Sequence, residues 1–66
     1  MPTRGPTLRR ERRLADVTAT AVAAALGVSR QTLWAIERSV DVTPERVAAY
    51  RAAVKTLSDA KGENAA

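Results

Sequence analysis

The side chains best suited to directional hydrogen bonding gather in one short segment, residues 29–38, with the sequence SRQTLWAIER. Arg30 and Gln31 carry planar groups that can form paired hydrogen bonds with a flat partner. Trp34, the only tryptophan of the chain, follows three residues after Gln31. The segment therefore offers the chemistry of recognition, in which a partner is bound and not transformed.

Side chains for catalysis or metal binding are scarce. The chain has no cysteine and no histidine, which removes thiolate and imidazole ligands and the usual nucleophile and base of covalent catalysis. Asp16, Asp41 and Asp59 are scattered, and no glycine-rich loop is present that can cradle phosphates. We therefore expect a protein that is not an enzyme and that uses no cofactor, no metal and no small-molecule ligand.

The 66 residues suffice for one small domain, which buries only about 60% of the surface of its unfolded chain. No apolar run is long enough to span a bilayer, and charged residues follow the arginine-rich start where a signal peptide would have an apolar stretch. The absence of cysteine fits a reducing compartment. The sequence thus predicts a soluble, cytoplasmic protein with no membrane partner.

Positive charge is concentrated at one end of the chain. Residues 1–13 carry a net charge of +4, which equals the net charge of the whole chain. The charged residues of this segment are Arg4, Arg9, Arg10, Arg12 and Arg13, with Glu11. Such an end indicates an anionic partner, either nucleic acid or an acidic membrane face, or else a solvated basic helix. Binding to a membrane is disfavoured because Leu8 and Leu14 provide little apolar area.

Proline and glycine mark the start of the chain as irregular. Residues 1–7, MPTRGPT, predict a flexible basic arm, after which Thr7 caps a first helix over residues 8–15. The residues of this helix that are available to the core are Leu8, Leu14 and Ala15.

Two short helices separated by a tight turn follow in residues 19–38. Thr18 is the N-cap candidate of a helix that ends at Leu26, Gly27 favours a left-handed turn, and Ser29 caps the next helix. The apolar residues expected in the angle between these helices are Val22, Leu26, Leu33 and Ile36, with Val28 at the turn and the small Ala23 on the inner face. The capping residues, the glycine and the apolar positions are each typical of a helix-turn-helix motif.

A fourth helix opens at Thr43 and Pro44, which are favoured at the N-cap and at the first helical position. Its core stripe comprises Val47, Tyr50, Val54 and Leu57. Residues 59–66 are polar or small and predict a frayed tail. The expected fold is all-α, a compact four-helix helix-turn-helix domain over residues 8–58 without strands.

The segment TATAVAAALGVSRQTLWAIER, residues 18–38, resembles the Cro and lambda repressor-like helix-turn-helix domains of phages and bacteria. The similarity includes Ala23, the corner Leu26-Gly27-Val28, the SRQT opening of the third helix and the pair Ile36-Glu37. It implies a Cro-like repressor of phage or prophage type that binds double-stranded operator DNA in the bacterial cytoplasm, at the nucleoid. The helix over residues 29–38 would enter the major groove.

With Leu33 and Ile36 facing inward, helical geometry turns other residues of this helix outward, where they can contact base edges. These residues are Arg30, Gln31, Trp34 and Ala35. The candidates for phosphate contacts are Ser29, Thr32, Arg38, Arg9, Arg10, Arg13 and Thr18, and Arg4 on the arm can reach a minor groove. The resemblance further implies a structural ion pair between Arg12 and Glu37. Simple phosphate contacts or solvation are the alternatives for Arg30 and Gln31.

Three departures from the family pattern qualify the resemblance. Ala19 stands where relatives usually carry a phosphate-binding glutamine, and the loop SVDVT, residues 39–43, contains an acid where basic residues are common. The fifth helix with which many relatives dimerise is missing. A weak homodimer, a dimer formed only on DNA and a monomer therefore all remain open.

Trp34 and the fold itself admit second interpretations. The indole ring either contacts DNA or a partner, or covers a seam between helices beside the core. The same fold can also serve as a protein-interaction module of the antitoxin or anti-repressor kind. Binding to a protein partner without binding to DNA would favour that alternative.

Overall fold

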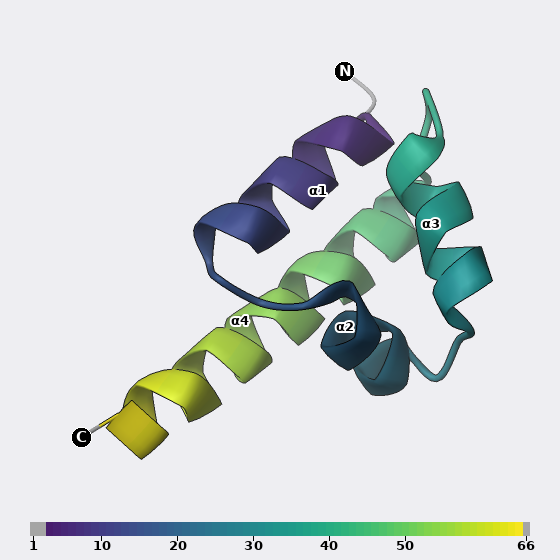
Figure 1. Ribbon diagram of the computed structural model, residues 1–66. Helices are drawn as coiled ribbons and strands as arrows, with labels where there is room; N and C mark the ends of the chain where they lie inside the picture. Colours follow the sequence, from purple (N-terminus) through teal and green to yellow (C-terminus); the bar gives the residue numbers. More distant parts are fainter. Residues whose placement is uncertain (1–2, 66) are drawn as a thin grey trace.

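Four helices make up the computed structural model, which describes residues 3–65 of the chain, with side chains through residue 60 (Figure 1). They are α1 (Gly5–Leu14), α2 (Ala19–Leu26), α3 (Arg30–Arg38) and α4 (Pro44–Ala65). Within residues 3–65 no strand forms, and the only β-type pairing is an isolated antiparallel bridge between Thr3 and Val42. The predicted all-α fold is confirmed.

Local capping signals fix the starts of three helices as the sequence predicts. In each case a hydroxyl oxygen accepts a hydrogen bond from the backbone N–H three residues later, which satisfies one of the free donors at the helix start. The pairs are Thr18 with Ala21 at 3.1 Å, Ser29 with Thr32 at 3.1 Å and Thr43 with Arg46 at 3.4 Å. Gly27 ends α2 with a φ of 70°, the left-handed conformation that glycine adopts at little cost.

The start of α1 differs from the prediction. The helix begins at Gly5, not at residue 8, and Arg4 rather than Thr7 occupies the N-cap position, with no side-chain cap. The N–H of Gly5 donates to the carbonyl oxygen of Ser39 at 2.8 Å, and the N–H of Val42 donates to the carbonyl oxygen of Thr3 at 3.0 Å. Residues 3–7 are therefore fastened to the loop after α3, and the expectation of a flexible arm over residues 1–7 is wrong for this part. Residues 1–2 lie outside the described residues.

We predict that the Gly5→Ala substitution destabilises the domain by about 1–3 kcal/mol, the usual range for overpacking. A Cβ at Gly5 would overlap the backbone carbonyl groups of Ile36 and Glu37 in the last turn of α3. Urea unfolding followed by circular dichroism measures the loss. The control is Thr7→Ala at an exposed position of the same helix, which should leave the stability unchanged or slightly higher. Equal stability of both variants would contradict the close contact.

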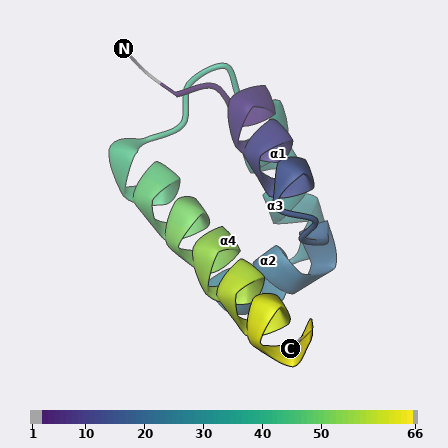
Figure 2. The same ribbon diagram turned by 90° about the vertical axis from the view of Figure 1, so that its left-hand side faces the viewer.

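Helix α4 also exceeds its predicted length. It runs through 22 residues to Ala65, about 33 Å at 1.5 Å per residue, whereas a frayed tail is expected after Ser58. The segment beyond Ser58 contains no proline, and a single glycine costs a helix only about 1 kcal/mol, which is too little to end it. The last turns of α4 extend past the other helices, and Figure 2 shows α4 along the whole molecule with α1 and α3 to one side.

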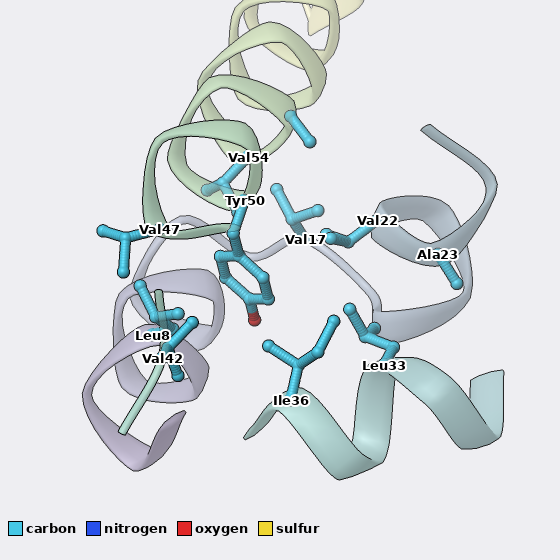
Figure 3. Packing of buried hydrophobic residues seen from close by; sticks show 11 residues of the cluster. Leu8, Val17, Val22, Ala23, Leu33, Ile36, Val42, Val47, Tyr50 and Val54 are labelled. Carbon is cyan, nitrogen blue, oxygen red and sulfur yellow. The ribbon is translucent and has the colours of Figure 1, made fainter. Parts of the chain in front are cut away.

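The hydrophobic core lies where the four helices meet, with Tyr50 of α4 at its centre (Figure 3). Its buried members are Leu8, Val17, Val22, Ala23, Leu33, Ile36, Val42, Val47, Tyr50, Ala53 and Val54. The predicted contributions of the helix-turn-helix motif and of the α4 stripe are confirmed, with Leu26, Val28 and Leu57 only partly buried at its edge. Val17 and Val42, both in connecting segments, complete the core.

Leu14 is wrongly predicted as a core residue, since it is 79% exposed. It lies six residues after the fully buried Leu8, which turns it about 240° around the helix from the inward direction. Arg12, four residues after Leu8, shares the inner face instead. Helix α1 therefore contributes an arginine to the interior at the position where a purely apolar face would place a leucine.

Candidate nucleic-acid interface

Helix α3 has one buried face and one exposed face. Leu33, Ile36 and Glu37 are buried. Ser29 caps the start of the helix, and after its end the carbonyl oxygen of Ser39 accepts a hydrogen bond from the N–H of Gly5. The four residues predicted to contact bases are all exposed: Arg30, Gln31, Trp34 and Ala35. These four form what we call the outer face of α3. A rigid helix thus presents two planar hydrogen-bonding groups, Arg30 and Gln31, in its first turn.

Glu37, the only charged residue that is buried among those the structure describes, fastens α3 to two other helices. Arg12 of α1 donates from Nε to Oε2 of Glu37 at 2.9 Å, which is the predicted ion pair. A second guanidinium nitrogen of Arg12 donates to the carbonyl oxygen of Val17 at 2.9 Å. Tyr50 of α4 donates from its hydroxyl group to the same Glu37 oxygen. The two side chains of the ion pair are only 12% and 4% exposed, so the buried carboxylate depends on these donors.

Burial raises the pKa of Tyr50, and the hydrogen bond to Glu37 together with its negative charge raises it further. The pKa of Arg12 is lowered by burial but raised more by its hydrogen bond to Glu37 and the attraction of that carboxylate, so that the net shift is upward. Both groups therefore keep their protons, and their hydrogen bonds to Glu37, throughout the physiological range of pH.

We predict that the domain loses stability as the pH rises above about 10, the ordinary pKa of tyrosine. Because the pKa of Tyr50 is raised in the folded state, its contribution to stability is complete below that pH and is lost as the pH rises toward the folded-state pKa. Tyr50 is the only tyrosine, so its absorbance as tyrosinate reports the titration directly. Tyrosinate should form in the folded chain only well above pH 10, and near pH 10 only in the unfolded chain. Ionisation near pH 10 in a chain that remains folded would contradict the hydrogen bond to Glu37.

Trp34 lies outside the core, at the surface between α3 and α1. Its side chain is 49% exposed, and the guanidinium carbon of Arg30, one turn earlier, lies 5.8 Å from the centre of its rings. That distance permits a cation–π contact, which restricts the freedom of the arginine. Trp34 also lines a hollow between α3 and α1.

This hollow, the α1–α3 groove, has a volume of about 360 Å³. Its lining residues are Arg9 and Arg12 from α1 with Trp34, Glu37 and Arg38 from α3. Three arginines against one carboxylate give the groove a positive charge. Arg10 and Arg13 are also exposed on α1, outside the groove lining.

The remaining predicted contacts lie apart from this groove. Thr18 caps α2 and Ser29 caps α3. The hydroxyl group of Ser29 also donates to the hydroxyl oxygen of Thr32 at 3.0 Å. Arg4 is exposed, but the anchored residues Thr3 and Gly5 flank it, so that it does not belong to a free arm.

Sequence reasoning missed three residues. Tyr50 was assigned only to the core, although its hydroxyl group completes the partners of Glu37. Arg51 forms a two-pronged pair with Glu11 at 2.8 and 2.9 Å. Arg46 lines a second hollow beside α3, together with Thr32 and Asp41. No local sequence signal places Arg46 beside α3, because that position depends on the path of the chain after α3.

A family model described as a helix-turn-helix domain matches residues 5–60, which is most of the chain. Searches among curated proteins and among solved structures returned no match. Among residues 3–65, no helix has the length and apolar character needed to cross a membrane, and the described side chains form no cluster of three or more metal ligands.

Proposed function

The chain belongs to the helix-turn-helix domain family, and from this premise we propose that it is a sequence-specific regulator of transcription that binds double-stranded DNA. The observation that carries the proposal is the outer face of α3. Arg30 and Gln31 are exposed in the first turn of a helix whose opposite face is fixed in the core. The N-terminal residues of such a helix are the ones that reach base edges in the major groove.

The chemistry of these two side chains suits base recognition. Arg30 can donate two hydrogen bonds to O6 and N7 of guanine, and Gln31 can pair with N6 and N7 of adenine. Trp34 adds an apolar surface at the groove edge, where thymine methyl groups and sugars lie. More specifically, we propose a Cro-like repressor of phage or prophage type, with transcription controlled by occupancy of the operator.

Phosphate contacts in this proposal come mainly from α1. Arg9, Arg10 and Arg13 are exposed there, and Arg38 extends the basic surface along α3. Additional candidates for phosphate contacts lie at the helix starts, namely Ser29, Thr32 and Thr18. Arg4 would contact a DNA strand from a fixed position. On the other flank of α3 the loop carries Asp41, so that Arg46 is the only cation that lines the hollow there.

Selection from a random duplex library tests the proposal. We expect one motif to be enriched by the wild-type chain, with a position that becomes relaxed in the Gln31→Ala variant. An inverted repeat in the motif would indicate a dimer on DNA, and a single half-site would indicate a monomer. Failure to enrich any sequence would contradict the proposal. In that case Trp34 becomes the residue through which to seek a protein partner.

We predict a strong dependence of DNA affinity on salt concentration. If about five phosphates are neutralised, the logarithm of the binding constant should fall with the logarithm of the salt concentration at a slope of about −4.5. Titrations at several salt concentrations give the slope. A flat response would show that the arginines of α1 do not contact the DNA backbone.

A further inference from the structure

We propose that the α1–α3 groove binds one phosphodiester group of the DNA backbone, held jointly by Arg9 and Arg38, with Trp34 packed against the neighbouring deoxyribose. The proposal rests on the proposed function and specifies how α1 takes part in it. In this proposal the C-terminal end of α3, which does not contact bases, contacts a single phosphate on one DNA strand.

The charges in the groove are arranged for an anion. Of its three arginines, Arg12 is neutralised by Glu37, whose Oε2 accepts hydrogen bonds from both Arg12 and Tyr50. Among residues 3–60, no acidic side chain pairs with Arg9 or Arg38, and both are exposed. Two guanidinium groups on different helices therefore border one hollow with their charges unopposed.

The groove also has the size and lining that a phosphodiester requires. Its volume of about 360 Å³ is many times the roughly 10–15 Å³ that one water molecule requires, which leaves room for the phosphate group and part of its hydration. The half-exposed ring of Trp34 forms an apolar wall, suited to the carbon-rich face of a sugar. Arginine is well matched to phosphate oxygens because its planar group can donate two parallel hydrogen bonds.

The position of the groove along α3 fits the geometry of a major-groove helix. Arg38 lies eight residues after Arg30, about 12 Å along the helix axis. When Arg30 reaches base edges, the far end of α3 must lie toward the edge of the groove, where the sugar-phosphate backbone passes. One helix thus carries base contacts at its start and a phosphate contact at its end, with α1 supplying the second arginine.

Replacement of individual phosphates by neutral methylphosphonates in a bound duplex tests this assignment. For the wild-type chain, one position on one strand should weaken binding by about 3- to 10-fold. Arg9→Gln and Arg38→Gln should each bind the unmodified duplex more weakly and lose sensitivity at that same position. Arg10→Gln, a matched change on α1 outside the groove, should keep it. Full sensitivity of both groove variants at every position would overturn the proposal.

The salt slope supplies a test that does not depend on a selected sequence. If Arg9 and Arg38 share one phosphate, the magnitude of the salt slope should be smaller by about 0.9 in the double variant than in the wild type. If they contact two separate phosphates, it should be smaller by about 1.8. The larger loss overturns the proposal even if sequence-specific binding is found. If selection enriches no motif, the proposed function fails, and the slope on any duplex still decides whether the two arginines share a phosphate.

Free anions provide the last arm of the test. Inorganic phosphate is added to the protein without DNA, and the fluorescence of Trp34, the only tryptophan, reports on the groove. The proposal predicts no saturable change at millimolar phosphate, because the phosphodiester is positioned by the rest of the duplex. Saturation at micromolar phosphate would identify a site for a small anion and overturn the assignment to DNA.

Discussion

The Arg12→Ala variant is expected to unfold with a free energy lower than that of the wild type by about 3–5 kcal/mol, the cost of removing one partner of a buried ion pair. The Glu37 carboxyl group would then lie at 4% exposure with only the hydroxyl group of Tyr50 as donor. The carbonyl oxygen of Val17 would also lose its bond from Arg12. Because α1, α3 and α4 meet at this network, α3 should lose its fixed orientation along with its stability. Urea unfolding followed by circular dichroism measures the change.

A second arginine–glutamate pair provides the matched control. Arg51 and Glu11 join α4 to α1 with two hydrogen bonds, but their side chains are 50% and 38% exposed. The hydrogen bond and charge of Arg51 lower the pKa of Glu11, yet solvent screens a pair of this kind. Arg51→Ala should therefore cost much less stability than Arg12→Ala. Equal losses would mean that burial does not govern the Arg12–Glu37 pair, and an unchanged Arg12→Ala variant would refute its structural role.

The second large effect is expected at Arg30. Arg30→Ala should weaken binding to the best operator by about 10- to 100-fold, which is about 1–3 kcal/mol, and should relax the preference for guanine at one base pair. The reason is the loss of two hydrogen bonds to one base, from a guanidinium group that lies 5.8 Å from the ring centre of Trp34. Titration of duplexes that carry each of the four base pairs at that position measures both quantities.

Lys55→Ala is the control for the loss of one positive charge, since Lys55 is exposed on α4 and lines neither of the hollows beside α3. It should reduce the affinity slightly and equally for all four base pairs. A uniform loss in Arg30→Ala, without a change in base preference, would mean that Arg30 contacts a phosphate. The base-reading role would then fall to Gln31 alone.

Elements with local signals were predictable from the sequence. Thr18, Ser29 and Thr43 cap the helices assigned to them, and Gly27 adopts the predicted left-handed turn, because each depends on residues within one helical turn. The exposed positions of Arg30, Gln31, Trp34 and Ala35 followed from helical periodicity once Leu33 and Ile36 were assigned to the core.

Features set by contacts between distant segments could not be predicted in this way. The start of α1 at Gly5 depends on the close approach of Gly5 to the backbone of α3. No pattern in residues 1–7 predicts that approach. The hydroxyl group of Tyr50 reaches Glu37 because of the way α4 packs near α3. The helical periodicity of α4 therefore predicts that the ring is buried, but it does not predict its hydrogen-bond partner. The α1–α3 groove likewise requires the arrangement of two helices that are far apart in sequence.

Selective binding to one DNA sequence distinguishes a transcription regulator from a protein that binds any duplex. The wild-type chain is titrated, at one salt concentration near the physiological value, with the best selected duplex and with a scrambled duplex of identical composition and length. We expect binding to the selected duplex to be about a thousandfold tighter or more, as is typical of specific recognition. Equal affinities for the two duplexes would contradict it, because the outer face of α3 would then read no bases.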